Sequence, residues 1–124
     1  MKITHDTYAP TASIELPLTQ PLEDYDIEDV EKPTPRDVDV VLVSQGFRDL
    51  VDDAAALLER ALAGTGLEVA QLTGAIVHGG GVYRPGLWLV LREAGVSGGQ
   101  AMSAAARERV AAIAEKLRAD LHLS

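Results

Sequence analysis

The residues best suited to chemistry surround a glycine-rich stretch in the middle of the chain. His78 is followed directly by Gly79, Gly80 and Gly81, and Arg84 lies shortly after them. Successive glycine amides can form a concave anion-binding site, and an imidazole beside it titrates near neutral pH. One hypothesis is therefore a small enzyme or ligand-binding domain that uses this stretch, with His78 and Arg84, around an anionic ligand. The plainer interpretation is the tip of a β-hairpin, because glycine is typical of tight turns.

Patterns for other catalytic and metal sites are weak. The remaining histidines, His5 and His122, lie near the two ends of the sequence, and the chain has no cysteine. No H-x-x-x-H pair, P-loop motif or G-x-S-x-G motif is present. We therefore assign no catalytic residue, expect neither a metal nor a cofactor, and favour a function other than catalysis.

A strongly acidic run is the second chemical feature. Residues 1–39 carry a net charge of −7, whereas residues 40–124 carry −1. Without a basic stripe, nucleic-acid binding is not expected. The charge is concentrated in residues 23–31, whose acids alternate with apolar side chains. The residues of this run that we predict to contact a partner are Glu23, Asp24, Tyr25, Asp26, Glu28, Asp29 and Glu31.

The acidic run belongs to a proline-rich segment that differs from the rest of the chain. Residues 1–37 contain five of the six prolines, which excludes a long helix there. We therefore predict an extended acidic arm at 1–37 and an α+β domain at 38–124. Within the arm, Ile14, Leu16 and Leu18 alternate with other residues. This spacing predicts a short edge strand at 12–18. The strand could take the place of a missing fourth strand in the chain's own sheet, or it could add to the sheet of a partner.

The domain itself shows alternating strand and helix periodicities. Its order, β-α-β-β-α, predicts an open-faced two-layer sandwich, with both helices on one side of a mainly antiparallel sheet. This is an incomplete ferredoxin-like layout, because no fourth strand follows the last helix. Ser103 is the predicted N-cap of that helix. The predicted elements are a strand at 38–44, a helix at 47–63, strands at 67–78 and 87–92, and a helix at 104–122. The predicted core contains Leu42, Leu58, Ile76, Leu89, Ile113 and Leu117.

The leading functional hypothesis is a non-enzymatic protein-binding or assembly module. Its acidic arm would contact a protein partner or a second copy, giving a homo-oligomer. The anion-binding domain around His78 and Arg84 is the alternative, and an acidic mimic of nucleic acid that blocks a basic protein surface is a third hypothesis. No secretory signal or membrane-spanning apolar run is visible, so we expect a cytoplasmic location without a membrane partner.

Overall fold

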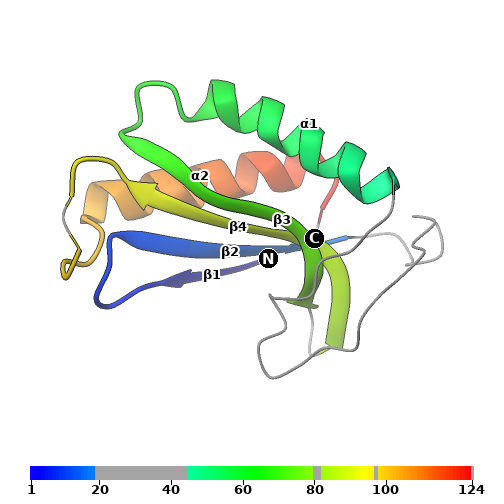
Figure 1. The fold of residues 1–124 in the computed structure, drawn as a ribbon, viewed down its shortest axis with the longest axis horizontal. Coiled ribbons are helices and arrows are strands. Elements are labelled where there is room, and N and C mark those ends of the chain that lie inside the picture. Colours follow the sequence, from blue (N-terminus) through cyan, green and yellow to red (C-terminus); the bar gives the residue numbers. More distant parts are fainter. Residues whose placement is uncertain (19–44, 80–81, 97, 124) are drawn as a thin grey trace.

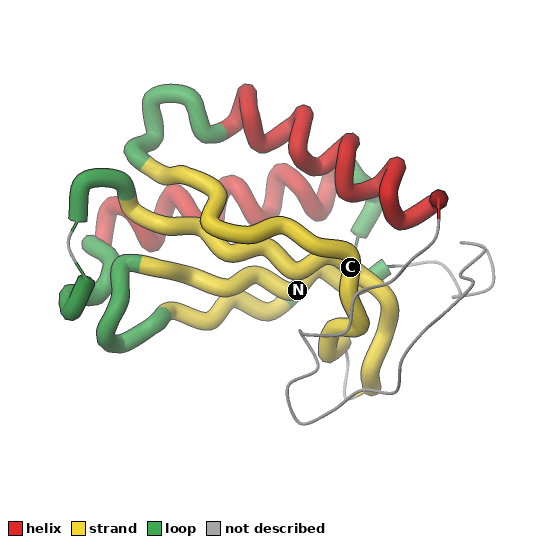
Figure 2. The backbone as a smooth tube through the Cα atoms, in the orientation of Figure 1, coloured by secondary structure: helices red, strands yellow, loops and turns green. Residues whose placement is uncertain are grey.

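The computed structural model describes residues 1–18, 45–79, 82–96 and 98–123 (Figure 1). These residues form an α+β arrangement of two layers. Both helices lie on the same face of an antiparallel sheet of four strands (Figure 2). The elements are β1 (Lys2–His5), β2 (Thr11–Pro17), α1 (Gln45–Ala61), β3 (Leu67–Gly79), β4 (Val82–Glu93) and α2 (Ala104–Asp120). The strand expected at 38–44 lies outside the described residues.

The order of strands in the sheet is β1-β2-β4-β3, and every neighbouring pair is antiparallel. The strand expected at the edge, 12–18, is therefore interior, because β2 pairs with β1 on one side and β4 on the other. The edge position belongs to β1, a strand that we did not predict. Its four residues are too few to show a clear alternation. Two of the four strands thus come from the segment that the sequence analysis assigned to the arm.

The core lies between the sheet and the helices, and strand alternation explains its composition. In β2, Ile14 pairs with Leu89 and Leu16 pairs with Leu87. All four side chains are fully buried, because alternate residues of a strand point to the same face of its sheet. The helices contribute the rest of the core. Leu58, Leu89, Ile113 and Leu117 are buried together, as predicted; Leu42 lies outside the described residues, and the side chain of Ile76 is not described.

Helix α2 begins at the N-cap that the sequence predicted. Ser103 Oγ accepts a hydrogen bond from the backbone N–H of Ala106, at 3.2 Å. The same residue is joined to the end of β4, since its backbone N–H donates to Glu93 Oε2 at 3.0 Å and its hydroxyl donates to Glu93 Oε1 at 2.8 Å. These two hydrogen bonds, first the backbone one, lower the pKa of Glu93 from its ordinary value of 4.5. The carboxylate thus fixes where α2 starts relative to the sheet.

Strands β2 and β4 approach each other closely at Gly86. A Cβ atom on this residue would lie 2.3 Å from the carbonyl oxygen of Leu16 and 2.9 Å from the Cα of Pro17. Just beyond, the backbone N–H of Leu18 donates to the carbonyl oxygen of Pro85 at 2.9 Å. Leu18 also forms a bridge to Leu123, beyond the end of α2. Glycine is therefore required by the spacing of the two strands at this point.

The face of the sheet away from the helices has a different composition. Glu15 of β2, Trp88 of β4 and Thr73 of β3 lie in one row across three strands. All three are half-buried. Trp88, the single tryptophan of the chain, therefore reports on the packing of the central strands.

Candidate functional site

The structure gives a structural role to three residues that we expected at a partner interface. Ile14, Leu16 and Leu18 are 0%, 0% and 2% exposed. They belong to the same core cluster as the buried faces of the two helices. An interior strand has no free edge, and its apolar face here is covered by the chain's own helices. These side chains are therefore not available to extend the sheet of another protein.

The other residues predicted to bind are described only in part. The acidic run of residues 23–31 lies outside the described residues, as do Gly80 and Gly81. The backbones of His78 and Arg84 lie in the β3–β4 hairpin, where His78 pairs with Tyr83 and Val77 pairs with Arg84. Successive positions of a strand belong to opposite faces of a sheet. Because Arg84 pairs with Val77 and not with His78, the strand register does not place His78 and Arg84 on the same face of the sheet.

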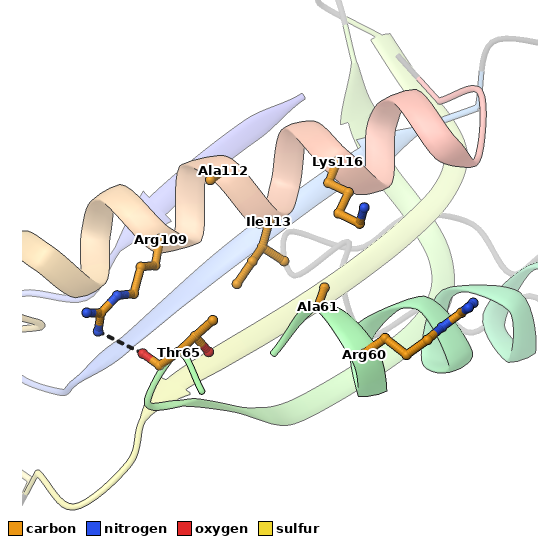
Figure 3. Close-up of a pocket in the computed structure, with 7 residues that line it drawn as sticks. All are labelled: Arg60, Ala61, Thr65, Arg109, Ala112, Ile113 and Lys116. Carbon is orange, nitrogen blue, oxygen red and sulfur yellow. Dashed lines mark hydrogen bonds between the residues drawn. The ribbon is translucent and has the colours of Figure 1, made fainter. Parts of the chain in front are cut away.

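A groove between the two helices is lined by positively charged and apolar side chains (Figure 3). We call it the inter-helix groove. It has a volume of about 450 Å³. The last turn of α1, the loop that follows it and the middle of α2 contribute its lining, which consists of Arg60, Ala61, Thr65, Arg109, Ala112, Ile113 and Lys116. Ile113 is 5% exposed and anchors the floor in the core.

The loop after α1 is held by Thr65, which fixes one wall of the inter-helix groove. The Thr65 hydroxyl donates to the carbonyl oxygen of Leu62 at 2.7 Å and accepts from the backbone N–H of Leu67 at 3.3 Å. Arg109 Nη1 then donates to the carbonyl oxygen of Thr65 at 2.8 Å, the dashed line in Figure 3. Arg109 therefore joins α2 to the loop, and its guanidinium stands at the rim of the groove.

The three cations of the groove differ in how far they are already neutralised. Lys116 Nζ lies 3.6 Å from Asp120 Oδ2, one turn along α2, in an exposed pair. Such surface pairs contribute little, typically about 0–1 kcal/mol. Arg109 lies close enough to Glu93 to lower the pKa of that carboxyl. Arg60 is exposed and forms no ion pair with another residue of the described part of the chain. The lining itself contains no acid, so the groove favours an anionic occupant.

A second groove flanks the other side of α1 and has the opposite charge. We call it the edge groove, because it lies between α1 and the edge strand β3. Its volume is about 520 Å³, and its lining consists of Ala55, Leu58, Glu59, Leu62, Leu67, Glu68, Val69 and Leu72. The charged residues in it are Glu59 and Glu68, and Glu68 Oε1 accepts from Arg92 Nε at 2.7 Å. Arg92 offsets the charge of Glu68, so an acidic segment on this side of α1 would meet the negative charge of Glu59 and no cation in the lining.

The residues that line the inter-helix groove are suited to binding a ligand. The one hydroxyl in its lining, that of Thr65, already donates to a carbonyl oxygen. Across the described ranges of the chain, no group of three or more His, Asp or Glu residues is placed to hold a metal ion. No helix in these ranges is long and apolar enough to cross a membrane. The groove has the charges and the apolar floor to hold an acidic, partly apolar chain.

Only part of this groove is visible in the sequence. Arg109 and Lys116 are seven residues apart, which places them on one face of a helix. That spacing is a signal, but it is equally typical of the exposed face of any amphipathic helix. Arg60 joins them only through the packing of α1 against α2, which no local pattern predicts.

Comparison of the chain with protein-family models, with curated proteins and with solved structures gave no match.

Proposed function

We propose that this chain is a protein-binding or assembly module, in which the acidic run of residues 23–31 contacts a protein partner or a second copy. Function rests on recognition by charge and apolar contact, without a catalytic step. The module combines an α+β sandwich with an acidic segment, residues 19–44, that carries most of the negative charge.

The distribution of charge is the observation that carries the proposal. Residues 19–44 hold a net charge of −6 out of the −8 of the whole chain. The described residues are close to neutral, at −2, and expose a groove lined by three cations. Six acids among nine residues repel one another, so the run gains from contact with positive charge. A protein surface with basic and apolar groups side by side satisfies both kinds of residue in the run.

The layout of the sandwich supports a finer description of the fold, which we propose as a ferredoxin-like variant. From β2 onward the order of elements is β-α-β-β-α, with β4 between β2 and β3 in the sheet. In this description the edge position beside β2 is taken by β1, which precedes the motif in the chain. We also propose a cytoplasmic location, which fractionation of cells that express the tagged full-length chain would test.

Light scattering coupled to size-exclusion chromatography tests the proposed function. The full-length chain is compared with a variant in which the six acids of residues 23–31 are replaced by Asn and Gln. We expect the wild type to form a complex, with itself or with an added partner, that weakens as salt screens exposed charges over about 8–10 Å. The neutralised variant should remain folded and lose the complex. If both proteins behave alike at low and high salt, the acidic run is not a contact element.

A further inference from the structure

We propose that the inter-helix groove is the receptor for the acidic run of residues 23–31 of a second copy of this chain. This inference rests on the proposed function and names the surface that the run contacts. It predicts self-association in which the arm of one copy lies between α1 and α2 of another.

The chemistry of the groove matches that of the run in two respects. Its lining contains the cations Arg60, Arg109 and Lys116, and its floor is formed by Ile113, with Ala61 and the exposed Ala112 beside it (Figure 3). The run carries six acids with Tyr25, Ile27 and Val30 among them. The acids can pair with the rim while the apolar side chains cover the floor. Ion pairs beside an apolar surface are stronger than isolated pairs in water, because solvent is partly excluded from them.

Charge also decides between the two grooves that flank α1. The edge groove is lined by Glu59 and Glu68, whereas the inter-helix groove is lined by three cations and no acid. An acidic chain placed in the edge groove would face like charges. The inter-helix groove is therefore the side of α1 that suits the run.

The groove is shorter than the run, so only part of the run would occupy it. Arg109 and Lys116 are seven residues apart on α2, which corresponds to about 10 Å along the helix axis. Nine extended residues span about 30 Å, so the run is long enough to cross the groove, and acids about three residues apart in it match the spacing of the two cations.

The attachment points of the arm favour a second copy. Strand β2 ends, and α1 begins, at the end of the sandwich opposite to the α1–β3 loop that carries Thr65 (Figure 1). For the run to reach the groove of the same molecule, the chain would have to pass along the length of α1 and return to its start. A neighbouring copy could bring its groove to the run without this detour. Self-association should therefore rise with protein concentration.

A complementation experiment tests the proposal with full-length chains. One chain has the six acids of residues 23–31 replaced by Asn and Gln and keeps its groove. The other keeps the acids and carries Arg60→Glu and Lys116→Glu. Arg109 is left intact because it supports the loop through Thr65. We expect each chain alone to be monomeric by light scattering and an equimolar mixture to form a one-to-one complex.

A peptide assay measures the same contact directly. The probe is a fluorescein-labelled peptide of residues 20–34, and the receptor is the acid-neutralised full-length chain, whose groove its own arm cannot occupy through charge. We expect saturable binding by fluorescence anisotropy. It should weaken about tenfold or more with Arg60→Glu, and stay within about twofold with the matched control Arg107→Glu, which reverses an exposed cation of α2 outside the groove.

The outcomes separate this inference from the proposed function. If the neutralised arm loses self-association but groove reversal leaves it intact, the module works through its arm and the groove is not the receptor. If Arg60→Glu and Arg107→Glu weaken the peptide equally, the contact is nonspecific and the groove inference is overturned. The wild type could instead stay monomeric at every concentration and show a larger hydrodynamic radius when Arg60 is replaced by Glu. This result would mean that the run occupies the groove of its own molecule, and it would refute binding to a second copy. If neither arm nor groove variants change anything, both proposals are refuted.

Discussion

Replacing Gly86 with alanine tests the closest contact in the sheet. The added Cβ would lie 2.3 Å from the carbonyl oxygen of Leu16, 2.8 Å from Val77 Cγ2 and 2.9 Å from the Cα of Pro17. Two of these three are backbone atoms of β2, so no side-chain rotation can relieve the clash. To restore an ordinary contact, β2 and β4 must separate by about 1 Å at this point, which weakens their hydrogen bonds.

We expect this substitution to cost about 3 kcal/mol, toward the upper part of the usual range for overpacking. Gly86 is held by strand pairing on both sides. It pairs with Pro17 of β2 on one side and with Ala75 of β3 on the other. A protein of this size loses about 1–3 kcal/mol of stability per molar urea. The unfolding midpoint should therefore fall by about 1–3 M.

Urea titration followed by the fluorescence of Trp88 provides the assay, since this single tryptophan lies two residues from the substitution. Gly98→Ala is the matched control, because a Cβ there meets no atom within 4 Å. Its midpoint should stay close to that of the wild type. If Gly86→Ala has the same midpoint as Gly98→Ala, the tight approach of β2 and β4 is wrong.

Four further predictions concern the ends of elements and the N-terminal strands. Ser103→Ala removes the N-cap of α2 and should cost about 1 kcal/mol in urea unfolding; no loss would contradict the cap. The pKa of Glu93 is lower in the folded state than in the unfolded state, so its stabilising contribution is complete above the ordinary value of 4.5 and is lost as the pH falls through the folded pKa. The stability difference between wild type and Glu93→Gln should thus be constant near neutral pH and shrink in acid; a difference unchanged down to pH 3 would refute this. Leu16→Ala should lower the free energy of unfolding by about 2–5 kcal/mol. A chain without residues 1–18 should lose its cooperative unfolding transition in circular dichroism. If the truncated chain stays folded, β1 and β2 are dispensable.

Local periodicity predicted the α+β class, the two helices and the β3–β4 hairpin well. Helix α1 begins two residues before the predicted start and α2 ends two residues before the predicted end. These elements have long apolar patterns, which are the most reliable signal in a single sequence. The capping role of Ser103 was also predictable, because a cap depends on residues within one turn of it.

The position of β2 was not predictable in the same way. The alternation of Ile14 and Leu16 indicated a strand, but the prolines and acids that follow favoured an arm and an edge. Its interior place depends on pairing with β4, roughly 70–80 residues later in the chain, and on the short strand β1. The inter-helix groove was missed for the same reason, because Arg60 and Arg109 line one groove only after α1 and α2 have packed.

The pairing of β2 also has a consequence for synthesis on the ribosome. Its partners in β4 run from Gly86 to Arg92. At about 5–20 residues per second, β2 exists for roughly 4–15 s before those partners are made. During that time the β1–β2 hairpin lacks the strand that joins it to the rest of the sheet, and an isolated two-stranded hairpin is marginally stable at best in water. The face that carries Ile14 and Leu16 therefore stays open to chaperones and to other nascent chains. The first part of this protein to be synthesised is among the last to be buried.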